Sequence, residues 1–137
     1  LEEAYGADST NLTYARALSA GYIEAGRMQD ALHINERLSA ADPEDDDVRY
    51  RLIQLYARTG ELKKGIQLAT ELQKRFQPMP EAYGQLTKMK IQLLALTKDS
   101  VAVGREYRTW AALYPEDRRP YYDWILHLFQ TGGVKEA

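Results

Sequence analysis

Cysteine is absent from the sequence, which excludes disulfide bonds and thiol chemistry. A chain without cysteine fits reducing and oxidising compartments alike, so the cytoplasm and a bacterial periplasm both stay open as locations. No apolar run approaches the roughly 18 residues that a membrane-spanning helix needs, and we expect no membrane span in this segment. Basic and acidic side chains nearly balance, 18 against 20, which disfavours nucleic acid as a partner.

Motifs of catalysis, metal binding and phosphate binding are also lacking. The two histidines, His33 and His127, are far apart, and His33 with Glu36 supplies fewer ligands than a metal site needs. The acidic run 44–47 lacks the glycine and the distal glutamate of a calcium loop. It directly precedes an expected helix, whose N-terminus favours negative charge, so we interpret it as a helix cap. We therefore expect no enzymatic activity, no cofactor and no metal.

What the sequence does contain is a repeat. The segments 20–32 and 54–66 align without gaps, with Gly60 in the place of Gly26, and the period of the repeat is about 34 residues. A third copy at the end of the chain places Gly132 two such periods and about one helical turn beyond Gly60. One further repeat, with an insertion of about one helical turn, therefore lies between them. We predict that the extra turn lengthens the first helix of that repeat.

Each repeat has the pattern of two amphipathic helices. Gly26 is expected to end the first helix, since glycine readily adopts a positive φ. Pro43 is expected to end the second helix, because proline disfavours the helical conformation in the residue before it. Apolar residues recur at spacings of three and four along the first helix of the clearest copy: Leu12, Ala15, Leu18 and Tyr22.

This order of aliphatic residue, tyrosine, glycine, small residue and Asp-Pro resembles the tetratricopeptide repeat family. The resemblance implies an all-α fold, a right-handed α-solenoid of helix-turn-helix repeats that covers nearly the whole chain. The expected organisation is the end of a preceding repeat and its loop in 1–11, repeat 1 in 12–45, repeat 2 in 46–79, a degenerate and longer repeat 3 in 80–117, and the first helix of a truncated repeat 4 in 118–137. Natural arrays end in polar caps and neither end shows one, so we expect a fragment of a larger protein.

Several residues depart from the family pattern. Ser19 stands where glycine is often found, and Asn35 where an aromatic residue is usual. Lys90 interrupts the apolar stripe of the third repeat, and the segment 97–100 replaces its glycine turn. Among the aromatic residues we expect Trp110 and Trp124 in the core, and Tyr122 and Phe129 nearer to a binding groove.

Family members bind extended peptides or partner helices on a concave wall that is lined by the first helices. By this resemblance the following residues face the wall: Arg16, Tyr50, Arg51, Gln54, Arg58, Lys88, Gln92, Arg119 and Tyr122. Arginine and tyrosine are favoured in binding hot spots, and the set is net basic, which favours an acidic or polar partner. The other interpretation is that the long side chains on any solenoid wall include some arginines.

The sequence therefore predicts a non-catalytic scaffold that recruits another protein, as a peptide or a helix, through its concave face. Two alternatives keep the fold. The chain also resembles periplasmic regions of bacterial exopolysaccharide export proteins, which contact polysaccharide or a modifying enzyme. In the second alternative the uncapped ends stack and the array self-associates. A clamp for the C-terminal carboxylate of chaperones is disfavoured, because the asparagines of its motif are missing.

Overall fold

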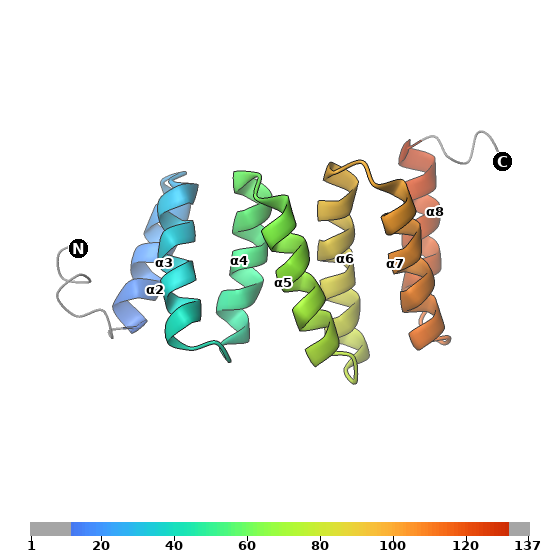
Figure 1. Ribbon diagram of the computed structural model, residues 1–137, viewed down its shortest axis with the longest axis horizontal. Coiled ribbons are helices and arrows are strands. Elements are labelled where there is room, and N and C mark those ends of the chain that lie inside the picture. Colours follow the sequence, from blue (N-terminus) through green and yellow to red (C-terminus); the bar gives the residue numbers. More distant parts are fainter. Residues whose placement is uncertain (1–11, 132–137) are drawn as a thin grey trace. The chain divides into compact units, whose positions relative to one another are not determined.

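The computed structural model describes residues 12–131, and all regular secondary structure in this range is helical (Figure 1). The helices are α2 (Leu12–Glu24), α3 (Met28–Ala41), α4 (Asp46–Thr59), α5 (Leu62–Arg75), α6 (Pro80–Leu96), α7 (Ser100–Leu113) and α8 (Arg119–Thr131). This arrangement confirms the predicted all-α class of helical hairpins. The segment 1–11 and the last copy of the repeat around Gly132 lie outside the described residues.

The chain divides into two compact units, one ending at Leu68 and the other beginning at Ala69. In the first unit α2 packs against α3, and α3 packs against α4. Leucine is the most frequent residue type in this core, and each buried leucine side chain contributes about 1.5–3 kcal/mol through its removal from water. The core residues include Ala15, Leu18, Tyr22, Ala31, Leu32, Leu38, Leu52, Leu55 and Tyr56.

In the second unit α6 packs against α7, and α7 packs against α8. Trp110 of α7 is fully buried, which confirms its predicted place in the core. Trp124 of α8 is half-buried and stacks on Tyr107, with ring centroids 5.8 Å apart. The prediction of a core position therefore holds in full for Trp110 alone.

Three inter-helix turns share one backbone geometry. Gly26 and Gly60 have φ values of 77° and 81°, as predicted for the glycine turns. Lys98, which follows α6, adopts the same left-handed conformation with φ of 62°. In each turn the amide after this residue donates to the carbonyl five positions earlier, which closes the helix end. These bonds are Arg27 N to Tyr22 O at 2.8 Å, Glu61 N to Tyr56 O at 2.9 Å, and Asp99 N to Leu94 O at 3.3 Å.

The extra turn of the third repeat lies in α6. This helix has 17 residues, against 14 in α4. It begins with Pro80, whose fixed φ suits the first position of a helix. The prediction that the insertion lengthens the first helix is confirmed.

Asp45 caps α4, as its Oδ1 accepts a hydrogen bond of 3.3 Å from the amide of Val48. Asp46 and Asp47 occupy the first turn of the same helix, where acidic side chains favour the positive end of the helix dipole. The interpretation of the acidic run as a helix cap is confirmed. Asp99 caps α7 in the same way, accepting from the amide of Ala102 at 3.0 Å.

A buried polar cluster joins α5, α6 and α7 within the second unit. Lys90, only 9% exposed, donates to Glu106 Oε2 at 2.9 Å and to Gln73 Oε1 at 3.2 Å. Gln73 in turn donates to Thr87 Oγ1 at 2.9 Å and to Glu106 Oε1 at 3.0 Å. The lysine that interrupts the apolar stripe is therefore a core residue whose charge is compensated by a neighbouring helix.

Candidate functional site

A row of polar side chains on α4, which we call the α4 stripe, comprises Arg51, Gln54 and Arg58. Their spacing of three and four residues places them on one face of the helix. Gln54 and Arg58 are exposed and Arg51 is half-buried. The Arg51 guanidinium donates to Asn35 Oδ1 at 3.5 Å, and that of Arg58 lies 3.8 Å from the sulfur of Met28.

Neither arginine of the α4 stripe forms an ion pair with a carboxylate in the part of the chain that the structure describes. Within residues 12–131 both guanidinium groups thus contact neutral atoms and have no carboxylate at ion-pair distance. The stripe is therefore suited to attract an anionic group from outside the chain.

The other two predicted residues of the first unit, Tyr50 and Arg16, lie in different environments. Tyr50 is half-buried, and burial, followed by the negative charge of Asp46, raises the pKa of its hydroxyl. It therefore stays a neutral hydrogen-bonding group at physiological pH. Arg16 is exposed on α2, but its guanidinium pairs with Asp45 at the start of α4. The charge of Arg16 is thus already compensated within the unit.

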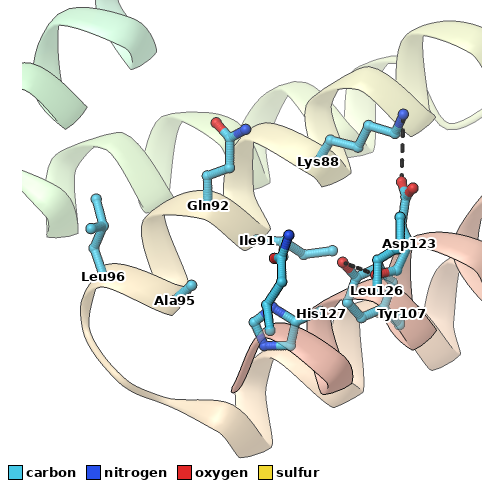
Figure 2. A pocket seen from close by; sticks show the side chains of 10 residues that line it. Lys88, Ile91, Gln92, Ala95, Leu96, Tyr107, Asp123, Leu126 and His127 are labelled. Atoms are coloured by element: carbon cyan, nitrogen blue, oxygen red, sulfur yellow. Dashed lines mark hydrogen bonds and ion pairs between the residues drawn. The ribbon is translucent and has the colours of Figure 1, made fainter. Parts of the chain in front are cut away.

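A hollow of about 540 Å³ lies between α6 and α8 in the second unit, and we call it the α6–α8 groove (Figure 2). The predicted residues Lys88 and Gln92 both line it. Helix α7 contributes Tyr107, whose hydroxyl donates to the backbone oxygen of Asp123 at 3.3 Å. The full lining is Lys88, Ile91, Gln92, Ala95, Leu96, Tyr107, Asp123, Leu126, His127 and Gln130.

Charge within the α6–α8 groove is internally compensated. Lys88 Nζ lies 3.4 Å from Asp123 Oδ2, and this ion pair bridges α6 and α8 (Figure 2). Burial, followed by the negative charge of Asp123, raises the pKa of Tyr107 to about 12, so its hydroxyl stays neutral. The remaining lining side chains are apolar, amide or imidazole groups. The groove therefore combines apolar side chains with one internal ion pair and with amide, phenol and imidazole groups.

The Arg119 side chain makes its contacts with other residues of the second unit. Its guanidinium donates to Asp117 at 2.7 Å, to Glu81 at 2.9 Å and to the Pro80 carbonyl at 3.2 Å, and it lies 5.3 Å from the Trp110 ring centroid. The hydrogen bond from Arg119 holds the pKa of Asp117 below its usual value. These contacts tie the start of α8 to the start of α6. Arg119 thereby positions one wall of the groove against the other.

Tyr122 and Phe129 lie on the exposed surface of α8, 62% and 64% exposed. Neither they nor Arg119 line the α6–α8 groove. Tyr122 instead borders a second hollow of about 700 Å³ beside the turn that precedes α8. Whether the predicted residues contact a partner stays a prediction.

Sequence reasoning missed the residues that α8 contributes to the groove, although a periodic signal was present. Four of them follow a lining residue of α6 at one constant interval, close to a single period of the repeat: Lys88 and Asp123, Ile91 and Leu126, Gln92 and His127, Ala95 and Gln130. The expected repeat starts, 80 and 118, are about one helical turn further apart than this interval. Because α6 is longer by about one turn, the residues of α8 that lie opposite it are shifted by this difference from the expected ones.

Metal-ligating side chains do not converge within residues 12–131, where no group of three or more His, Cys, Asp or Glu side chains surrounds a common point. His33 Nδ1 lies 4.0 Å from Glu36 Oε1 at the surface of α3. Over the same range, none of the helices is both long and apolar enough to cross a membrane.

Paired helices and glycine turns define the class of this protein as a helical-repeat protein. Residues 22–88 match the family model of the tetratricopeptide repeat, so this segment belongs to that family. The match confirms the resemblance seen in the sequence. No curated protein matches the chain significantly. Tetratricopeptide repeats generally mediate protein–protein interaction and form a non-catalytic fold.

Proposed function

We propose that the chain is a non-catalytic scaffold that recruits another protein, and that the α4 stripe docks an acidic segment of this partner. The observation that carries the proposal is that the guanidinium groups of both arginines contact neutral atoms. Arg51 and Arg58 are held by an amide oxygen and a sulfur, which orient the guanidinium groups without neutralising them. A partner carboxylate would supply the missing charge, and the planar guanidinium binds carboxylates with two parallel hydrogen bonds.

Three other cations of the described residues, by contrast, are each paired with a carboxylate. Arg27 is paired with Asp30 at 2.7 Å, Lys64 with Glu61 at 3.4 Å, and Lys88 with Asp123 at 3.4 Å. The chain as a whole has a net charge of −2, so its positive field is local. A local positive field of this kind raises the association rate of an acidic partner. Added salt screens the field and so lowers this rate.

The test is the double charge reversal Arg51→Glu with Arg58→Glu, in capture of partners from an extract and an envelope fraction of the source cells. The matched control is Lys63→Glu with Arg105→Glu, two exposed residues of the second helices α5 and α7, which changes the net charge by the same amount. We expect the first variant to lose the captured partner and the control to retain it. Thermal unfolding of both variants checks that the fold is intact. This check is needed because Arg51 is half-buried and donates to Asn35, whereas exposed substitutions change stability by only about ±0.5 kcal/mol.

Retention of the partner by the Arg51→Glu, Arg58→Glu variant would contradict the role of the α4 stripe. Equal loss in both variants would show that overall charge, rather than this stripe, governs binding.

A further inference from the structure

We propose that the α6–α8 groove binds a short, uncharged, apolar segment of the partner protein. This inference rests on the proposed function and gives the chemistry of a second contact, distinct from the acidic contact at the α4 stripe. Its basis is the charge compensation, the exposed apolar side chains and the dimensions of the groove.

The charge compensation within the groove favours an uncharged ligand residue in its interior. Lys88 and Asp123 neutralise each other across the groove at 3.4 Å. A ligand carboxylate would be repelled by Asp123, and a ligand ammonium by Lys88, so either would compete with this pair. Burial of an unpaired charge is far more costly than burial of an apolar group. The complementary ligand is therefore neutral.

Apolar side chains are exposed on both walls. Leu96 of α6 is 61% exposed and Leu126 of α8 is 57% exposed, and Ile91 and Tyr107 are buried beneath them. Covering exposed leucines contributes roughly 25 cal/mol per Å² of apolar surface removed from water. An aliphatic or aromatic ligand side chain therefore gains most of its binding free energy from these residues.

Two side-chain amides accompany the apolar surface. Gln92 of α6 and Gln130 of α8 are both exposed and both line the groove. Each amide has donor and acceptor atoms, which is the combination that pairs with the N–H and C=O groups of a peptide. Figure 2 shows Gln92 extending from α6 on the same side as Leu96. An extended peptide backbone thus finds hydrogen-bond partners without any charged residue.

The dimensions limit the length of the segment. Lys88 and Leu96 are eight positions apart on α6, which corresponds to about 12 Å at 1.5 Å per residue. An extended chain advances about 3.3–3.6 Å per residue, so about four residues span the groove.

The experiment uses three acetylated tetrapeptide amides that differ only in their central pair: Ser-Leu-Leu-Ser, Ser-Glu-Glu-Ser and Ser-Lys-Lys-Ser. Binding to the full chain is followed by NMR through the side-chain amide signals of Gln92 and Gln130. We expect the leucine peptide to shift both signals with an affinity that is unchanged between low and high salt. The acidic and basic peptides are expected to bind about tenfold more weakly or not at all.

A matched pair of variants locates the contact. Leu126→Ser removes an exposed groove residue, and Ile125→Ser removes its exposed neighbour on α8, which does not line the groove. We expect Leu126→Ser to weaken the leucine peptide about tenfold and Ile125→Ser to leave it unchanged. Equal effects of the two variants, tighter binding of a charged peptide, or no shift with any peptide would overturn the inference.

The two proposals fail separately. Loss of the captured partner on reversal of Arg51 and Arg58, with no shift by the leucine peptide, would retain the acidic contact and overturn the apolar one. A groove that binds the leucine peptide, in a chain whose partner tolerates the arginine reversal, would retain the apolar contact and overturn the role of the α4 stripe.

Discussion

The side chains of Ser19 and Asn35 form a buried pair, in which Asn35 Nδ2 donates to Ser19 Oγ at 2.6 Å. Both residues are fully buried, and the same nitrogen also donates to the Ala31 carbonyl at 2.7 Å. Both positions depart from the family pattern, where glycine and an aromatic residue are common. The two departures are therefore a single feature that ties α3 to α2.

Truncation of this pair is expected to destabilise the first unit. Asn35→Ala leaves the Ser19 hydroxyl without its donor and opens a small cavity, which lowers the free energy of unfolding by about 1–3 kcal/mol. The double variant with Ser19→Ala should cost less than the sum of the single changes, with a coupling of about 1 kcal/mol. Urea denaturation measures these differences. Gln54→Ala, an exposed amide on α4, serves as the control, and additive effects of the pair would contradict the prediction.

Replacement of Lys98 by glycine is expected to stabilise the protein. Its φ of 62° is the conformation that Gly26 and Gly60 adopt in the equivalent turns. A side chain in this region costs about 1–2 kcal/mol, so Lys98→Gly should raise the free energy of unfolding by about 1 kcal/mol after the entropy that glycine adds to the unfolded chain. The reciprocal change Gly60→Ala has open space around the new Cβ and should lower stability through φ alone. Thermal unfolding that shows no opposite shift for the two variants would refute the assignment.

Gly84→Ala is expected to disturb the attachment of α8. A Cβ at this position would lie 2.6 Å from Arg119 Nη2 and 2.9 Å from the Trp110 ring. Such overpacking typically costs about 1–3 kcal/mol. Gly21→Ala on α2, where no atom lies within 4 Å of the new Cβ, should instead stabilise its helix by about 0.5–1 kcal/mol. Chemical denaturation of the two variants should therefore give changes of opposite sign.

Acid is expected to weaken the contact that Asp117 makes with Arg119. The hydrogen bond from Arg119 lowers the folded-state pKa of Asp117 below its ordinary value of 3.8. Its stabilising contribution is therefore fully present above that value and is lost as the pH falls through the lower folded-state pKa. Asp117→Asn should be less stable than the wild type at pH 7, and this difference should shrink towards pH 2 in thermal unfolding. A difference that is constant with pH would contradict the role of the ionised carboxylate.

Local features of the sequence were enough to predict the helices and where they end. The glycine turns at Gly26 and Gly60, the cap at Asp45 and the longer α6 all follow from residues that are close to one another along the chain. The predicted division into repeats and the predicted partner-binding residues stay predictions. The conformation of Lys98 was less accessible, because lysine is not a residue type that indicates a positive φ.

Features that depend on packing between helices were harder to predict. Lys90 interrupts an apolar stripe, but the sequence did not indicate that its partner is Glu106 on α7. An ion pair between two helices produces no periodic pattern in the sequence. The α8 side of the groove was missed because the extra turn of α6 shifts which residues of α8 lie opposite it. Asp123 faces Lys88 as a result, and Arg119 is used to attach α8.

Helical hairpins of similar sequence can pair with the wrong neighbour during folding, and such misassembly is characteristic of repeat proteins. The position of Ser19 recurs one period later as Ile53, which is buried. If α3 were to dock on α4 as it docks on α2, the amide of Asn35 would meet an isoleucine and lose its acceptor. The position of Tyr56 likewise recurs one period later as Lys90, whose charge requires Glu106. We expect these buried polar groups to favour pairing of each helix with its native neighbour over pairing with a near copy.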